Sequence, residues 1–343
     1  MNDRFLRAAR RQPVDTTPVW FMRQAGRSLP EYRKIRERWR LVDIVADPDL
    51  CAEVTLQPVR RLGVDAAVMF SDIVLPLRAL GLEFDLVDGV GPVLAEPVRS
   101  AAAVDALRSD PAQEAVPAML AAVERVARAA DVPVICFSGG PFTLASYIIQ
   151  GGPSSDHALT KSFMWSEPAA FDRLLARLAA LAVDYLVAQV GAGAAAIQIF
   201  DSWVGILSQE DYVKRILPHT SAIFESLSVL AVPRIHFGTG TAGILEQIAN
   251  CGADVVGLDW RVPLDQGWSR IGAGLAVQGN LDPALLLAPR PYLAERVREV
   301  LERAGGRPGH IFNLGHGVLP QTSPDALQEV VELVHLGLGA SFG

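Results

Sequence analysis

The sequence is poor in cysteine and shows no pattern typical of a disulfide framework. Its 343 residues include three cysteines, Cys51, Cys136 and Cys251, which lie far apart and form no Cys-x-x-Cys pair. Such usage is typical of a reducing compartment, so a cytoplasmic location is expected. The low hydrophobicity of a disordered protein is also missing, because half of the residues are hydrophobic and a fifth are charged.

Long apolar segments are scarce as well. The longest uncharged run covers residues 132–155, and Pro133, Pro141 and Pro153 interrupt it. A membrane helix needs about 20 mainly apolar residues without such breaks. The start of the sequence lacks the apolar stretch of a signal peptide. We therefore expect a soluble protein with no membrane partner.

Motifs for common cofactors are absent too. No Gly-x-Gly-x-x-Gly follows the first predicted strand, which leaves a dinucleotide site without support. The histidines show neither His-Glu-x-x-His nor another spacing typical of zinc ligands. We expect no cofactor and no bound metal. The net charge of −7 and the pI near 5.4 also argue against nucleic acid as a partner, because nucleic acid favours a broad basic surface.

Positive charge is nevertheless concentrated at the start of the sequence. Residues 1–40 contain eleven Arg or Lys and four Asp or Glu, a net charge of +7, so the rest of the chain carries −14. Two interpretations fit: a solvated helix face with internal ion pairs, or a site for a small anion. Arginine supplies most of these bases, and its rigid fork suits carboxylates. Arg23 and Arg27 would share one face of a helix, although Gly26 also allows a loop that turns both inward.

Short apolar runs rich in β-branched residues alternate with helical patterns. This order predicts parallel β-α-β units, and eight runs predict one (β/α)8 TIM-type barrel domain over residues 1–343, with an open doubly wound sheet as the alternative. We expect the Arg-rich segment, about residues 1–40, to contribute to the active-site cleft. The expected strands are 18–22, 66–70, 134–137, 195–200, 234–237, 254–258, 276–279 and 310–314; the expected helices include 113–130, 167–190, 209–230 and 292–304, with helix starts at Ser208, Asp282 and Ser323; and 83–98 is expected to form a hairpin.

Chemistry in such a barrel lies where strands end and the following loops begin. Polar residues at these ends include Asp72, Ser202 and His316. Each has a structural alternative: Asp72 or Ser202 could cap a helix, and the glycines beside His316 could serve a tight turn. Tyr147 follows a Gly-Gly-Pro loop and could pack in the core instead of lining a site.

One block of sequence is specific enough to indicate a family. The string Pro18-Val-Trp-Phe-Met-Arg-Gln-Ala-Gly-Arg27, continuing Ser-Leu-Pro-Glu-Tyr-Arg33, resembles the signature of uroporphyrinogen decarboxylases. The similarity extends over roughly residues 3–340. Further blocks similar to that family follow in its order: Phe70-Ser-Asp-Ile73, Gly140-Pro-Phe-Thr-Leu144 with Tyr147, Phe200-Asp-Ser202, Gly257-Leu-Asp-Trp260, Gln278-Gly-Asn-Leu-Asp282 and Asn313-Leu-Gly-His-Gly317.

The resemblance implies a cofactor-free carboxy-lyase of tetrapyrrole (haem and chlorophyll) synthesis. Such an enzyme removes four acetate carboxyls from uroporphyrinogen III, giving coproporphyrinogen III and carbon dioxide, on a (β/α)8 barrel that forms a homodimer. Matched position by position, it implies Asp72, Arg23 and Arg27 as catalytic residues. The implied substrate-binding residues are Arg23, Gln24, Ala25, Gly26, Arg27, Asp72, Tyr147, Ser202 and His316, with Arg36 as a weaker candidate.

Departures and rivals also bear on this expectation. Ser28 stands where the family usually has Tyr, and Gln150 and Pro153 interrupt a stretch that usually reads Glu-Gly-Gly-Gly. The zinc-dependent cobamide methyltransferases resemble the same fold but need a His-x-Cys motif, whereas the corresponding run here is His236-Phe-Gly238. A non-catalytic tetrapyrrole-binding protein is the other alternative. Loss of Asp72 or of both arginines would have indicated it, and all three residues are present.

Overall fold

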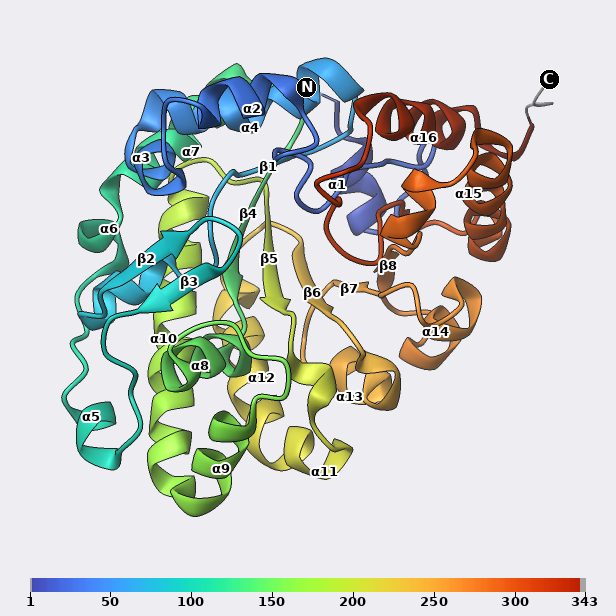
Figure 1. Ribbon diagram of the computed structural model, residues 1–343. Helices are drawn as coiled ribbons and strands as arrows, with labels where there is room; N and C mark the ends of the chain where they lie inside the picture. Colours follow the sequence, from blue (N-terminus) through green and yellow to red (C-terminus); the bar gives the residue numbers. More distant parts are fainter. Residues whose placement is uncertain (1, 340–343) are drawn as a thin grey trace.

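Seven short parallel strands form the centre of the fold in a computed structural model that describes residues 2–339 (Figure 1). They hydrogen-bond in sequence order, so a crossover connection joins each strand to the next. The interior strands are buried along nearly their whole length, as expected where helices cover one face and barrel side chains the other. The strands are β1 (Ala67–Val68), β4 (Val134–Gly139), β5 (Ala196–Asp201), β6 (Arg234–Gly238), β7 (Val255–Gly257), β8 (Ala276–Gln278) and β9 (His310–Ile311).

The segment 18–22 occupies the eighth position between the two sheet edges. Val19 forms a parallel bridge with Phe312, and the Phe312 amide donates to the Pro18 carbonyl at 2.8 Å. On the other side, the Asp65 amide donates to the Val19 carbonyl at 2.8 Å. The predicted strand 18–22 is therefore reduced to one bridge, yet it still joins β9 to the residues before β1. This arrangement confirms the predicted barrel-type α/β fold.

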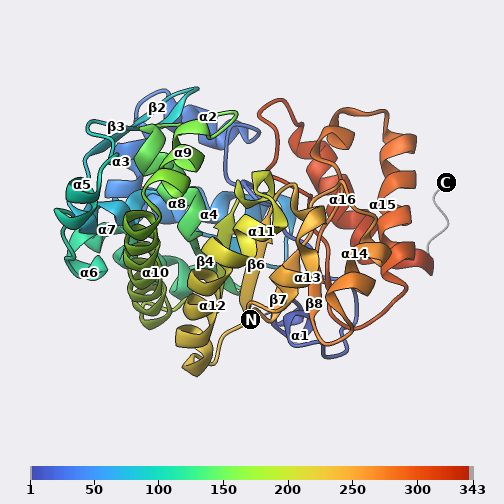
Figure 2. The same ribbon diagram turned by 90° about the horizontal axis from the view of Figure 1, so that it is seen from below.

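Helices cover the outside of this sheet (Figures 1 and 2). The α-helices are α1 (Arg4–Ala9), α2 (Pro30–Arg36), α3 (Leu41–Ala46), α4 (Pro48–Leu62), α5 (Ala101–Asp105), α6 (Ala112–Ala115), α7 (Pro117–Ala129), α8 (Pro141–Gln150), α9 (Ala158–Ser166), α10 (Pro168–Gly191), α11 (Gln209–Asp211), α12 (Leu217–Ser226), α13 (Leu245–Ala249), α14 (Leu264–Ile271), α15 (Arg290–Ala304) and α16 (Pro324–Leu336). Short 3-10 helices are η1 (Leu75–Leu80), η2 (Val204–Ile206), η4 (Leu227–Val229), η5 (Thr241–Gly243), η6 (Pro283–Leu287) and η7 (Gly337–Gly339), and η3 (Tyr212–Ile216) is a π-helix.

One predicted helix is broken at a proline. The helix expected at 113–130 divides into α6 and α7 at Val116, directly before Pro117. Proline has no amide proton and disfavours a helical conformation in the preceding residue, which explains this break. The helix expected at 209–230 runs without a break through α11, η3, α12 and η4, with a π-helical turn directly before α12 and its Pro218.

Other local predictions are confirmed. The side chains of Ser208, Asp282 and Ser323 each accept a hydrogen bond from an amide in the first turn of the helix that follows. The hairpin predicted within 83–98 consists of β2 (Phe84–Val87) and β3 (Gly91–Leu94), and its turn holds Asp88-Gly89.

Helix α10 is long and apolar enough to pass a length-and-composition test for a membrane span. Half of its most apolar window is buried, and the helix packs against α8, α12 and β4. Such burial is expected for the core helix of a soluble protein, because a lipid-facing helix would expose its apolar side chains.

Candidate active site

A cavity of about 670 Å³ opens at the carboxyl ends of β1, β4, β5 and β6. Three groups of residues line it: the loop after the segment 18–22, the strand ends, and the β2–β3 hairpin. Among the lining residues are Arg23, Ala25, Gly26, Arg27, Arg36, Asp72, Tyr147, Ser202 and His316, which include every predicted site residue except Gln24.

Arg23 and Arg27 reach the cavity from a loop. Residues 21–29 form turns, so of the two conformations that the sequence allowed, the loop is the observed one. Arg23 adopts a left-handed backbone conformation with φ of 60°, which bulky residues rarely adopt. Its side chain runs over Gly317, where an added Cβ would lie 2.5 Å from Arg23 Cδ. Gly317 therefore provides the space through which this guanidinium enters the cavity.

Gln24 lies beneath this loop and does not line the cavity. Its side chain is fully buried; Oε1 accepts from the Phe21 amide at 3.0 Å, and Nε2 donates to the Ala66 carbonyl at 3.0 Å. The amide thus connects the loop to the start of β1. Gln24 supports the neighbouring Ala25 and Gly26, which do line the cavity.

Asp72 is a partly buried carboxylate that lines the cavity. It follows β1, and its Oδ1 accepts from the Val74 amide at 3.1 Å, so the capping interaction suggested by the sequence is partly realised. Burial raises the pKa of Asp72 above its usual range, while the Val74 amide and the charge of Arg23 act in the opposite direction. Since one hydrogen bond occupies Oδ1, the carboxylate retains acceptor capacity for a ligand.

Tyr147 lies near Asp72 on the α8 side of the cavity. Burial and the negative charge of Asp72 both raise the pKa of Tyr147, so the phenol keeps its proton near neutral pH. Its ring packs at 4.3 Å, between centroids, on Trp203. Ser202, the residue before Trp203, does not cap η2, and its carbonyl accepts from Thr239 Oγ1 at 2.5 Å. Both predicted residues are therefore at the cavity, and the capping alternative for Ser202 is wrong.

His316 presents a neutral imidazole to the same cavity. Burial and the positive charges of Arg23 and Arg261 lower the pKa of His316 to about 4, against an opposing effect of Asp259. The Gly317 amide donates to His316 Nδ1 at 2.7 Å, which assigns the ring proton to Nε2. His316 can consequently donate one neutral hydrogen bond to a ligand.

Phenylalanine rings form an apolar wall of the cavity that was not among the predicted site residues. Phe70, Phe137, Phe200 and Phe237 come from four neighbouring strand positions. Phe200 packs edge-on against Phe137 at 5.2 Å and Phe237 at 5.9 Å, between ring centroids. The signal was available, since four predicted strands end in phenylalanine. These rings give the cavity an apolar surface.

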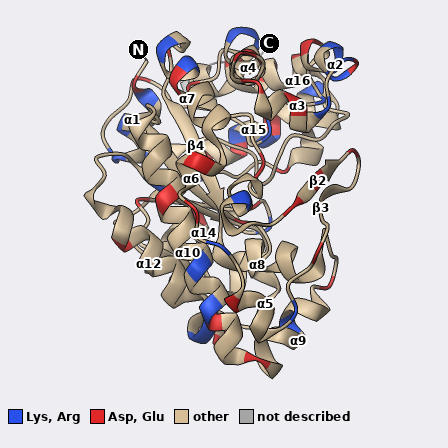
Figure 3. Cartoon of the chain, turned by 90° about the vertical axis from the view of Figure 1, so that its left-hand side faces the viewer, with Lys and Arg blue, Asp and Glu red and all other residues tan. Residues whose placement is uncertain are grey.

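The β2–β3 hairpin adds a charged contact at the edge of the cavity. It extends beside α2 and α3 in Figure 3. Arg36, at the end of α2, forms an ion pair with Asp88 in the hairpin turn. The Arg36 side chain is 15% exposed and that of Asp88 is 76% exposed, so this pair lies at the boundary with solvent. Exposed pairs of this kind are weak, which leaves Arg36 available for exchange to another carboxylate.

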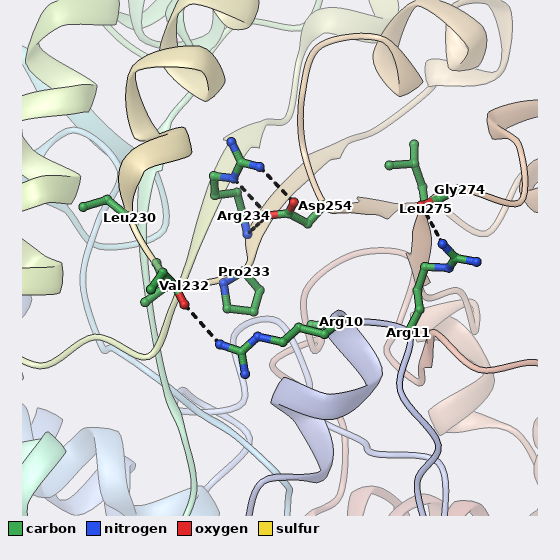
Figure 4. Close-up of a pocket in the computed structure, with 11 residues that line it drawn as sticks. Arg10, Arg11, Leu230, Val232, Pro233, Arg234, Asp254, Gly274 and Leu275 are labelled. Carbon is green, nitrogen blue, oxygen red and sulfur yellow. Dashed lines mark hydrogen bonds and ion pairs between the residues drawn. The ribbon is translucent and has the colours of Figure 1, made fainter.

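A second hollow of about 400 Å³ lies at the opposite end of the barrel, around the loops that precede β6 and β8 (Figure 4). Arg10 donates to the Ala231 carbonyl and Arg11 to the Gly274 carbonyl, each at 3.1 Å. These contacts attach the segment after α1 to the barrel. The arginines of the basic N-terminal segment therefore differ in position: Arg10 and Arg11 donate to backbone carbonyls of the barrel, whereas Arg23 and Arg27 line the cavity.

The position and composition of the cavity indicate a class of protein. Arginines, the carboxylate of Asp72 and an aromatic wall meet at the carboxyl ends of barrel strands, where barrel enzymes hold their active sites. Within residues 2–339, no group of three or more His, Cys, Asp and Glu side chains is arranged to hold a metal ion. The fold and the position of the cavity are typical of an α/β-barrel enzyme.

Comparison with known proteins specifies the family. The model of the uroporphyrinogen decarboxylase family matches residues 1–336. A uroporphyrinogen decarboxylase of Thermobifida fusca is 54% identical over 332 residues, which cover 96% of this chain and 92% of the relative. One of Sorangium cellulosum is 51% identical over 337 residues, which cover 98% and 96%. The chain belongs to the uroporphyrinogen decarboxylase family and is a carboxy-lyase.

Solved structures support the fold alone. A methyltransferase from Methanosarcina mazei superposes with a TM-score of 0.79 over 97% of both chains, at 19% identity. A B12-independent methionine synthase from Shewanella sp. W3-18-1 gives a TM-score of 0.57 at 12% identity and covers 84% of this chain and 87% of the other. The TM-scores establish a shared barrel fold. At such low identities the two structures carry no information on the reaction.

Proposed function

We propose that this chain converts uroporphyrinogen III to coproporphyrinogen III and four molecules of carbon dioxide, with no cofactor, in tetrapyrrole biosynthesis. The observation that carries the proposal is the composition of the cavity: Arg23, Arg27 and Arg36 line it together with Asp72 and a phenylalanine wall. The substrate has the complementary composition, with eight carboxylates around a ring of four pyrroles.

The arginines would hold the carboxylates of the substrate. A guanidinium donates two parallel hydrogen bonds to a carboxylate, and each charge-assisted bond contributes about 1.5–3 kcal/mol. The aromatic wall would contact the pyrrole rings and exclude water. Because the whole chain carries a net charge of −7, attraction of the substrate depends on the local field of the cavity and not on the net charge.

The substrate supplies its own electron sink. Protonation of a pyrrole ring carbon gives an azafulvenium-like cation, and the electrons of the breaking carbon–carboxyl bond flow into it as carbon dioxide leaves. The exocyclic methylene then takes up a proton, and the ring loses the first one. Each acetate therefore becomes a methyl group at the net consumption of one proton.

Asp72 would stabilise the cationic intermediate. The pyrrole N–H groups converge on the face of the macrocycle, and the ionised carboxylate would accept their hydrogen bonds. The carboxylate is already desolvated and fixed by the Val74 amide, so little reorganisation accompanies the reaction. Tyr147, Ser202 and His316 would position the reacting acetate and its neighbouring carboxylates.

The proton would come from a bound water or a substrate carboxyl. An arginine has a pKa above about 12 and is a poor acid, so Arg23 and Arg27 serve as clamps in this mechanism. Two further expectations belong to the same proposal: the chain acts as one barrel domain in a homodimer, and it is located in the cytoplasm.

The deciding experiment is an anaerobic incubation of metal-free protein with uroporphyrinogen III, followed by oxidation and chromatography of the porphyrins. The proposal expects species with seven, six and five carboxyls that converge on four. If only the eight-carboxyl species remains, the proposal is wrong. A binding titration would then separate a non-catalytic carrier, which binds the substrate, from a chain that does not recognise it.

A further inference from the structure

A buried polar cluster lies directly behind the wall of the cavity. Asp201 is the last residue of β5, between Phe200 and Ser202, which both line the cavity. Because side chains alternate along a strand, the Asp201 carboxylate points to the opposite side, toward the helices. There its Oδ1 accepts from Thr143 Oγ1 at 2.9 Å, and its Oδ2 faces His236 Nε2 at 3.8 Å. The side chains of Asp201 and His236 are both fully buried.

A fully buried carboxylate lowers the stability of a fold unless its charge is paired, so its presence here needs a reason other than stability. Transfer of such a charge from water is unfavourable unless it is paired, and well-packed apolar residues often replace buried pairs without loss. Burial lowers the pKa of His236, whereas the neighbouring Cys251 and Asp201 raise it to about 10. Among the described residues, Asp201 Oδ2 and His236 Nε2 have no hydrogen-bond partner, so this pair leaves polar atoms unsatisfied.

The cluster connects two elements that bring predicted site residues to the cavity. Thr143 lies in the first turn of α8, one turn before Tyr147, and its Oγ1 also accepts from the Trp203 amide at 3.3 Å. One hydroxyl group thus joins α8 to both the carboxylate of Asp201 and the backbone after Ser202. The packing leaves little freedom, since a Cβ on Gly140 would lie 2.5 Å from Asp201 Cγ.

We propose that Thr143 and Asp201 are positioning residues, which hold Ser202 and Trp203 at the end of β5 in register with Tyr147 on α8. Neither residue lines the cavity, so both act through the residues that do. The inference rests on the proposed function, because it assigns the cluster to positioning the reacting acetate. It concerns turnover more than affinity, since the arginine clamps lie on other elements.

The test compares Thr143→Val with Thr143→Ser. Valine keeps the shape and removes the hydroxyl, whereas serine keeps the hydroxyl. Because misplacement of a reacting group by about 1 Å can cost about 100-fold, we expect Thr143→Val to lower kcat at least about tenfold with KM within about threefold, and Thr143→Ser to restore most of it. Thr220→Val is the matched control: Thr220 is buried in α12, outside the cavity lining, and its Oγ1 has no partner among the described residues.

A double-mutant cycle with Ser202→Ala adds a readout that a merely structural role would not change. If Thr143 acts through the end of β5, Thr143→Val costs less in the Ser202→Ala background than in the wild type. Additive losses, wild-type kinetics of Thr143→Val, or equal losses in the valine and serine variants would each overturn the inference.

A folding failure of Thr143→Val leaves a second variant to decide. Thr143→Ala also removes the hydroxyl group and leaves more room than valine, so we expect the same fall in kcat with KM within about threefold. Wild-type kinetics of a folded Thr143→Ala would overturn the inference. Inactivity of the wild-type chain would instead refute the proposed function, so the two failures are distinguishable.

Discussion

Replacement of Asp72 by asparagine should affect turnover and the stability of the fold in different ways. The substitution keeps the size of the side chain and the acceptor for the Val74 amide, and it removes the negative charge. In the proposed mechanism that charge stabilises a cationic intermediate in a cavity that excludes water. Loss of one preorganised group of this kind costs about 2.7–4 kcal/mol of transition-state stabilisation. We therefore expect Asp72→Asn to lower kcat by about 100- to 1,000-fold.

The stability of the fold should not fall with the activity of Asp72→Asn. Burial raises the pKa of Asp72 above its value in the unfolded chain. A group whose pKa is raised by folding stabilises the fold below its unfolded pKa, and this contribution is lost as the pH rises through the folded value. Ionised Asp72 therefore destabilises the folded state at neutral pH. Asp72→Asn should melt no lower than the wild type at pH 7, and the difference should shrink at acid pH.

Turnover by porphyrin chromatography and melting by calorimetry at two pH values measure both effects. Asp105→Asn is the control, because Asp105 forms an exposed ion pair with Arg173 outside the cavity lining. We expect this variant to keep wild-type turnover. Near-normal turnover of Asp72→Asn would refute the central role of the carboxylate, and a large fall in its melting temperature at pH 7 would refute the stability argument.

Three further predictions concern the groups around Asp72. Arg27→Ala should lower kcat/KM by about 10- to 100-fold, because one or more charge-assisted bonds of about 1.5–3 kcal/mol are lost; unchanged kinetics would contradict a clamp. Asp88→Asn should free Arg36 and lower KM by up to about fivefold, as expected for an exposed pair worth at most about 1 kcal/mol, and a raised KM would contradict competition by Asp88. The pH profile of kcat/KM should fall on the acid side as Asp72 takes up a proton, above the usual aspartate range; His316→Asn should leave that limb in place, since the pKa of His316 is already about 4.

Much of the fold could be predicted from the sequence because its causes are local. Alternating apolar runs indicated the parallel strands, and capping residues such as Ser208 and Ser323 marked helix starts whose hydrogen bonds span a few residues. Pro117 could have corrected the helix predicted at 113–130, since a proline acts on the residue directly before it. The position of the polar candidates at strand ends followed from the barrel rule alone.

The sequence by itself determined the ingredients of the site: a cluster of arginines, an aspartate after the second predicted strand, and strands that end in phenylalanine. Only the tertiary structure decided which members of each set meet. Arg10 donates a hydrogen bond to the Ala231 carbonyl, more than two hundred residues away, whereas Arg23 enters the cavity over Gly317. Gln24, inside the signature, turns to the Ala66 carbonyl. Partners so distant along the chain leave no local pattern, because only the closure of the barrel brings them within hydrogen-bonding range.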